Sequence, residues 1–133
     1  MKKSSKILLG GAVVLVGLAV TYRAVNQAPD ATLPPNEQMA QIVNDGGCVF
    51  CHTANPDLPF YASFPVAETL ITKDVVEGYK AFDIAPMMQA LAEGTAVNEV
   101  DLAKVEKCVA DGTMPLMQYY VAHWGSSLTS TKT

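Results

Sequence analysis

The sequence predicts an all-α protein in which an apolar N-terminal helix precedes one small helical domain. Three observations favour this fold class. Apolar residues recur at helical spacing in several segments, prolines and glycines stand where those segments begin and end, and no segment alternates with the two-residue period of a β-strand. The chain has 133 residues and no evident internal repeat, so it has room for one domain of this kind.

The apolar segment 7–20 predicts that most of the chain is exported. Lys2, Lys3 and Lys6 precede this segment, and Arg23 follows it. Positive charge before an apolar stretch is retained on the cytoplasmic side of the inner membrane, so the remainder of the chain is expected to face the periplasm or an equivalent outer space.

Two interpretations of this segment stay open, an uncleaved membrane anchor and a cleaved signal peptide. A spanning helix needs about 20 apolar residues, whereas the apolar region of a signal peptide has about 7–15, which fits the length better. The only small-x-small cleavage candidate, 17–19, lies inside the apolar run, however. Gly10 and Gly11 also suit a membrane helix. We expect an uncleaved anchor.

Composition divides the chain into a signal-anchor at 1–25, a Pro-containing linker at 26–35 and one domain at 36–133. All thirteen acidic residues but only five lysines follow Val25, so the exported part carries a formal charge of −8. This charge excludes a nucleic acid as partner. A basic redox protein such as a cytochrome, a neutral quinol or a further domain of the same polypeptide remain as candidate partners.

Helical spacing places the elements of this domain in order. A first helix is expected at 37–45, ended by two glycines, and an amphipathic helix at 66–82. A helix that begins after Asn98, with Asp101 as a weak capping-box partner, is expected to close at Gly112. Shorter helices are expected at 86–91 and 115–123, and a loop with three prolines and three aromatic residues at 53–65.

The most informative motif is Cys48-Val-Phe-Cys51-His52, a C-x-x-C-H sequence. Two cysteines at this spacing can each form a thioether to a vinyl group of the same porphyrin, and the adjacent histidine can then bind the iron. The motif predicts one covalent haem c, bound by Cys48, Cys51 and His52, with His52 as a ligand of the metal. Because a macrocycle adds buried surface, we expect a small cytochrome-c-like fold around it. The loop at 53–65 either packs within itself or also wraps one face of the porphyrin.

A thioredoxin-like redox pair or a zinc site also uses a C-x-x-C sequence. A redox pair should follow a β-strand, and none is expected before Cys48. A zinc site needs two further ligands, and only Cys108 and His123 remain, both far along the chain. Haem attachment is therefore favoured, and we expect Cys108 to be a buried, unreactive thiol.

The second axial position of the iron is expected to belong to Met114. This residue lies in the sequence Gly112-Thr-Met-Pro115, about 60 residues after the haem motif. The glycine lets the chain turn and the proline fixes the backbone just after the methionine. A thioether ligand raises the reduction potential relative to bis-histidine coordination.

Other side chains are alternatives for that position. Met87, Met88 and Met117 are expected to fill the core. His123, which precedes Trp124, has three interpretations: a hydrogen-bonding residue at a helix end, the sixth ligand of a bis-histidine haem, or a proton-handling group beside a substrate pocket.

Beyond the motif, the sequence at 48–66 resembles a haem-binding domain of exported bacterial proteins. Segments 74–78 and 112–124 match the pattern of that domain as well, in the right order. The resemblance covers about 37–128 and is closest to the N-terminal monohaem module of membrane-anchored trihaem cytochrome c peroxidases, including quinol peroxidases. In that family the single haem passes electrons to a C-terminal dihaem peroxidase unit.

The same resemblance implies His/Met ligation of the iron, by His52 and Met114. The sequence contains no second C-x-x-C-H motif, so the catalytic haem of such a peroxidase cannot lie in these residues. No acid–base or nucleophile set argues for catalysis within the chain. We expect either a part of a longer enzyme or a free-standing monohaem cytochrome.

The expected function is electron transfer. The haem would receive electrons from quinol or a cytochrome and pass them toward a peroxidase unit that reduces hydrogen peroxide, so this chain would be one module of an oxidoreductase. A quinol-oxidising site lined by Tyr119, His123 and Trp124 is an alternative, because quinol oxidation releases protons. A haem sensor with a displaceable sixth ligand is a third.

Overall fold

The computed structural model describes residues 3–126 and 128, and this part of the chain contains helices and no β-strand. The all-α fold class is confirmed. The helices are α1 (Lys3–Val25), α2 (Pro35–Asp45), α3 (Cys48–Cys51), η1 (Phe60–Ser63), α4 (Pro65–Ala81), α5 (Ala85–Glu93), α6 (Glu99–Ala110), α7 (Met117–Ala122) and η2 (Trp124–Ser126), where η marks a 3-10 helix. The ends of the helices expected from the sequence differ from these by at most two residues.

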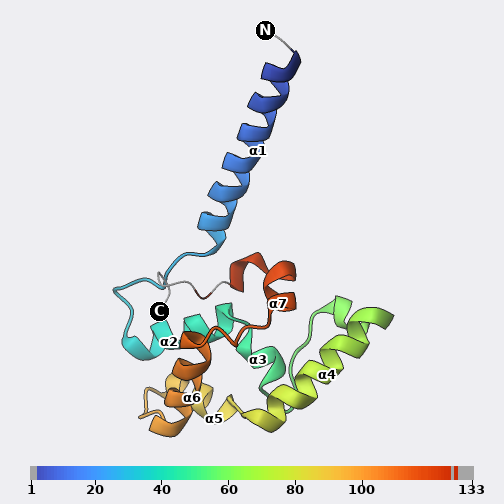
Figure 1. Cartoon of the computed structure of the whole chain (residues 1–133). Coiled ribbons are helices and arrows are strands. Elements are labelled where there is room, and N and C mark those ends of the chain that lie inside the picture. The colour runs from blue at the N-terminus through green and yellow to red at the C-terminus, as the bar shows by residue number, and fades with distance from the viewer. Residues whose placement is uncertain (1–2, 127, 129–133) are drawn as a thin grey trace.

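Helix α1 projects from the rest of the molecule as a single long rod (Figure 1). Its segment Lys6–Val25 has 20 residues, a mean hydropathy of 1.9 and no buried part. A helix of this length is about 30 Å long, which equals the hydrocarbon thickness of a bilayer. By length and composition α1 can cross a membrane, although a signal sequence would meet the same criteria.

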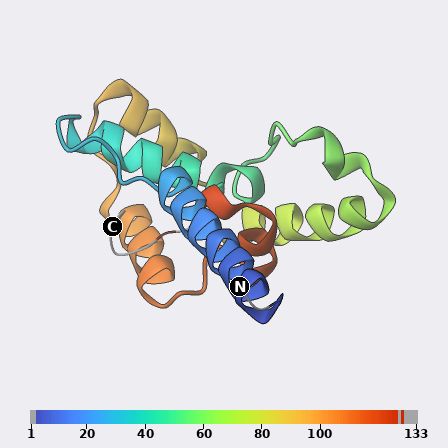
Figure 2. The ribbon, with the colours of Figure 1, turned by 90° about the horizontal axis from the view of Figure 1, so that it is seen from above.

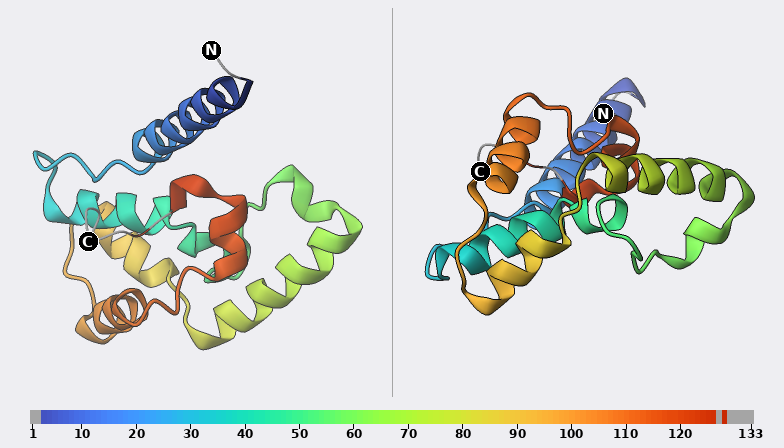
Figure 3. Two further views of the ribbon diagram at one scale, coloured as in Figure 1. Left: turned by 45° about the horizontal axis from the view of Figure 1, so that its top comes forward. Right: turned by 90° about the horizontal axis from the view of Figure 1, so that it is seen from below.

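The remaining helices form two packed groups that lie next to each other. Helix α2 packs against α5 on one side, and α3 packs against α4 on the other. Both views in Figure 3 show α3 and α7 in the middle, with α4 and the loop before it on one side and α2, α5 and α6 on the other. Seen from above, α1 runs over this middle region (Figure 2). The haem motif in α3 therefore lies at the centre of the domain.

The buried apolar core lies on the α2–α5 side. Val43, Ile84, Met87 and Leu91 are each 4% exposed or less. Each such side chain stabilises the fold by about 1.5–3 kcal/mol. Four of them make a small core for a domain of this length, so a bound macrocycle would add apolar burial that the polypeptide needs.

Helix ends follow the local sequence. Prolines occupy the first turn of three helices, at positions 35, 65 and 86. The Asn98 side chain accepts a hydrogen bond of 2.9 Å from the Val100 N–H and so caps α6, as predicted. The predicted capping box is wrong in its second half, because the Asp101 carboxylate pairs with Lys104 at 3.2 Å.

The loop before α4 contains the short helix η1 and its own aromatic cluster. Phe60 meets Tyr61 and Phe64 edge to face, at ring-centroid distances of 5.7 and 6.0 Å. Phe60 is 81% exposed and Phe64 is 55% exposed, so this cluster lies on the surface. Of these three rings, Tyr61 is the one that lines the central cavity described below.

Candidate haem site

A cavity of about 530 Å³ lies between α3, α4 and α7. This volume falls within the range of about 300–1,000 Å³ that is common for cofactor and small-molecule sites. Cys48, Cys51 and His52 line it from the motif, and Met114 lines it from a segment about 60 residues later. The four residues predicted to hold the haem therefore lie around one cavity, while the bonds themselves remain a prediction.

The two cysteines lie on the single turn of α3. Gly47, just before that turn, has φ of 69°, a left-handed conformation that favours glycine, and a Cβ at this position would collide with the Tyr119 hydroxyl. Burial raises the pKa of the Cys48 thiol to about 11. Burial, and secondarily the Asp74 carboxylate, also raise the pKa of Cys51. In the polypeptide alone both thiols are thus held protonated at neutral pH.

His52 is fixed by the segment between α4 and α5. Its ring Nδ1 lies 3.0 Å from the carbonyl oxygen of Phe82, and its own carbonyl accepts a hydrogen bond of 2.8 Å from the Ile84 N–H. Because a carbonyl only accepts, Nδ1 carries the proton and Nε2 keeps its lone pair. Such a second hydrogen bond orients metal-binding histidines in general. The hydrogen bonds of His52 therefore suit a histidine that binds iron through Nε2.

Helix α4 forms one apolar wall of the cavity. Ala67, Leu70 and Ile71 line it, and Leu70 is 55% exposed although it belongs to the apolar face of the helix. Gly78 lets α4 approach α3 closely, since a Cβ at this position would lie 2.5 Å from the Cys51 carbonyl oxygen. An apolar surface that lines a cavity in this way is suited to contact the flat face of a porphyrin. Sequence reasoning missed this role of Gly78, although a glycine inside an amphipathic helix is a signal of close approach.

Met114 is held in place by the turn that follows α6. Gly112 has φ of 63°, as the predicted turn requires, and the Cys108 carbonyl accepts hydrogen bonds from Thr113 N and Met114 N at 3.1 and 3.4 Å. Pro115, the next residue, is buried. The backbone on both sides of Met114 is therefore fixed where its side chain lines the cavity.

The other candidate methionines lie elsewhere. Met87 is 2% exposed in the core and Met88 packs against that core, which confirms the prediction for both. Met117 is 75% exposed, so the prediction that it fills the core is wrong. It begins α7 and lines a different cavity, on the outer face of that helix. Of the four methionines considered, Met114 is the one that lines the central cavity.

Both ring nitrogens of His123 have protein partners. Nδ1 lies 3.1 Å from the Tyr119 carbonyl oxygen, and Nε2 lies 2.5 Å from the Tyr61 hydroxyl. Since the carbonyl only accepts, Nδ1 donates to it and the Tyr61 hydroxyl donates to Nε2. The Tyr119 ring also stacks on the imidazole, with ring centroids 4.0 Å apart. These contacts favour the interpretation of His123 as a hydrogen-bonding residue over that of an iron ligand. Sequence reasoning missed Tyr61 as its partner.

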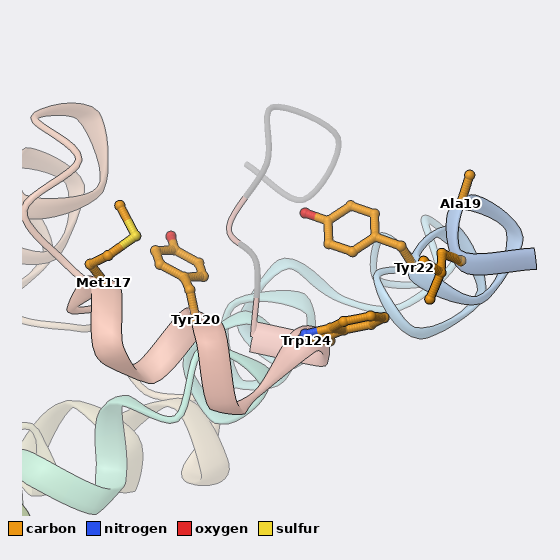
Figure 4. A pocket seen from close by; sticks show the side chains of 6 residues that line it. Ala19, Tyr22, Met117, Tyr120 and Trp124 are labelled. Carbon is orange, nitrogen blue, oxygen red and sulfur yellow. The ribbon is translucent and has the colours of Figure 1, made fainter. Parts of the chain in front are cut away.

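Trp124 does not share a pocket with Tyr119 and His123, so the predicted three-residue quinol pocket is wrong as a unit. Tyr119 and His123 line the central cavity. Trp124 lines a separate cavity of about 620 Å³ together with Tyr22 and Tyr120, between α1 and α7 (Figure 4). Tyr119 lies in α7 and His123 caps it, whereas Trp124 begins the separate helix η2.

The zinc interpretation of the C-x-x-C sequence finds no support in the described part of the chain. Within it, no group of three His, Cys, Asp or Glu side chains lies close enough to hold a metal ion such as zinc. Cys108 is a free thiol of intermediate burial, so it is less buried than expected.

An all-α domain with a C-x-x-C-H turn beside an apolar cavity defines a haem-binding, cytochrome-like protein. A family model described as "Haem-binding domain" matches residues 9–133, and the chain belongs to that family. The chain is also similar to "Cytochrome c peroxidase Ccp" of Escherichia coli (strain K12), with 30% identity over 140 residues and 97% of this chain covered. It spans 30% of the length of that curated relative. No solved structure shows a significant match. The predicted resemblance to a cytochrome-like haem-binding domain is confirmed.

Proposed function

We propose that the chain is an electron-transfer domain with one covalent c-type haem. Thioethers to Cys48 and Cys51 would attach the cofactor, and His52 and Met114 would bind its iron from two sides. One observation carries this proposal: segments about 60 residues apart bring these four side chains to a single cavity. The haem, when bound, accepts and releases one electron at a time.

The protein's own contribution is positioning and insulation. The Phe82 carbonyl holds the His52 ring at the required tautomer. The α4 wall supplies apolar surface, and the hydrogen-bonded pair of Tyr61 and His123 lines the cavity next to α7. A thioether from Met114 would favour the reduced iron and raise the reduction potential.

We further propose the arrangement of the whole chain: an uncleaved inner-membrane anchor at 1–25, a linker at 26–35, and a haem domain at 36–133 that faces the periplasm. Three lysines before the apolar segment 7–20 support this orientation. The electrons would come from quinol or a cytochrome and go to a dihaem peroxidase unit that reduces hydrogen peroxide. The similarity to a peroxidase more than three times as long supports this destination.

Mass spectrometry tests the cofactor assignment directly. The protein, expressed with a c-type haem maturation system, should gain the mass of one haem and keep it through acid–acetone extraction. Exchange of both Cys48 and Cys51 for serine should leave a polypeptide from which any haem is extracted. Haem lost from the unaltered protein on extraction, or a gain of two haems, would contradict the proposal.

Quinol as the direct electron donor is favoured by one further observation. The cavity of about 620 Å³ between α1 and α7 lies on the other face of α7 from the haem cavity. A quinol analogue should then reduce the haem of the detergent-solubilised protein. Ala19→Leu, which fills that cavity, should slow the reduction several-fold, while Ala12→Leu, elsewhere on α1, should not. Equal rates of haem reduction in the two variants would show that the quinol analogue does not donate its electrons from this cavity.

A further inference from the structure

Helix α7 and the residues after it have two faces of different character. Tyr119 and His123 lie on the face that lines the haem cavity. Met117, Val121 and Trp124 follow one another at intervals of four and three residues and are 75%, 71% and 47% exposed. We call this outer row of three the α7 apolar face, and each of its side chains is classed as exposed in the described part of the chain.

The α7 apolar face lies beside the outer end of α1. Met117 and Trp124 share their cavity with Leu18 and Tyr22 of α1 (Figure 4). The side-chain amide of Asn26, just after α1, donates a hydrogen bond of 2.5 Å to the Trp124 carbonyl. In Figure 1, α7 lies at the end of the domain nearest α1, and α5 and α6 lie at the opposite end. The position of α7 along the axis of α1 is therefore defined.

Because a helix rises by a fixed distance per residue, the position of α7 along α1 gives the depth of α7 in the bilayer. The candidate span ends at Val25. At a rise of 1.5 Å per residue, Tyr22 lies about 4.5 Å and Leu18 about 10 Å inside that end. Side chains that share a cavity with these two residues lie at the boundary between headgroups and acyl chains. Interfacial helices bury their apolar faces about 5–10 Å at this boundary, and Trp and Tyr are enriched there.

The charge distribution also favours this face as the one that approaches the membrane. Residues 112–131 contain no Asp, Glu, Lys or Arg, whereas the exported part as a whole carries a formal charge of −8. An anionic membrane surface repels an acidic protein surface. The uncharged segment that contains α7 is therefore the part of the domain that can approach lipid without repulsion.

We propose that the α7 apolar face inserts into the outer leaflet of the membrane and holds the haem domain against the lipid. This inference rests on the proposed membrane anchor. Phospholipid covers the part of this face that lies outside the cavity proposed for quinol, so α7 separates the bilayer on one side from the haem cavity on the other. Docking in this way would place the cavity beside α7 within about one helix diameter of the membrane.

Spin labels at three valines test the insertion in the complete holoprotein, reconstituted in vesicles of phosphatidylcholine and phosphatidylglycerol. The variants are Val13→Cys in α1, Val121→Cys in α7 and Val100→Cys in α6, each with Cys108→Ser. These valines are 65%, 71% and 63% exposed, so they are matched in accessibility. Collision with oxygen, which concentrates in lipid, is compared with collision with a water-soluble nickel chelate, with the iron kept reduced.

We expect oxygen to dominate at positions 13 and 121 and the nickel chelate to dominate at position 100. The nickel chelate dominating at 121 while oxygen dominates at 13 would overturn the insertion and leave the anchor intact. Low collision with both reagents at 121 would also overturn it, because another protein surface would then cover the face. Dominance of the nickel chelate at 13 would refute the anchor and the insertion with it.

Discussion

The Nδ1 atom of His52 lies 3.0 Å from the carbonyl oxygen of Phe82, 30 residues further along the chain. This contact fixes which ring nitrogen is protonated and leaves the lone pair of Nε2 available to bind a metal. The hydrogen bond from Ile84 N–H to the His52 carbonyl holds the backbone of the same residue. The end of the C-x-x-C-H motif is therefore oriented by the segment between α4 and α5 before any cofactor binds.

The His52 ring proton should exchange slowly with solvent in the reduced holoprotein. The Phe82 carbonyl shields it, and an iron-bound Nε2 prevents tautomer exchange. Nitrogen-edited NMR measures this proton, and the chain has only two histidines, so His123→Ala assigns the signal. A His52 Nδ1 proton that exchanges as fast as in free imidazole would argue against the contact.

Gly78→Ala should destabilise the holoprotein by about 1–3 kcal/mol, the usual cost of overpacking a close contact. The added Cβ would lie 2.5 Å from the Cys51 carbonyl and push α4 away from the haem motif. The helix propensity of alanine acts in the opposite direction, by up to about 1 kcal/mol. Urea unfolding measures the difference.

Gly125→Ala is the control for this variant, because its Cβ would have an ordinary contact of 3.6 Å with the Val25 carbonyl oxygen. Stabilisation by Gly78→Ala, as expected for an exposed helix, would show that α3 and α4 do not approach each other this closely.

Tyr61→Phe should destabilise the protein by about 1 kcal/mol, since the partly buried Nε2 of His123 loses its donor. Tyr79→Phe, which alters a tyrosine that is 40% exposed on α4, serves as the control. The iron coordination should stay unchanged in both variants. A shift of Tyr61→Phe to a bis-histidine spectrum would reveal that the released His123 competes with Met114.

Features that depend on the local sequence could be predicted, whereas contacts between residues far apart in the chain could not. The helices and the haem motif follow from spacing, caps and a five-residue signature, all of which are local. The partnership of His123 with Tyr61, 62 residues apart, depends on how α7 meets the loop before α4. The exposure of Met117 likewise depends on which face of α7 meets the domain. No sequence period encodes these choices, because α7 has only 6 residues, fewer than two turns.

Carbon monoxide should bind slowly or not at all to the ferrous protein, because Met114 is expected to occupy the sixth position from a rigid turn. Met114→Ala should open that position and bind the gas many-fold faster, as measured by flow spectroscopy. Rapid binding by the unaltered protein would favour the sensor interpretation over electron transfer.

The near-infrared spectrum of the ferric protein tests the central claim, that one cavity places His52 and Met114 on two sides of a single haem. Iron bound to a methionine thioether has a weak charge-transfer band in this region. The account predicts that the band is present, disappears in Met114→Ala and survives in Met117→Ala, whose altered side chain lies outside the haem cavity. A band that survives in Met114→Ala, or is absent from the unaltered protein, would contradict the assignment.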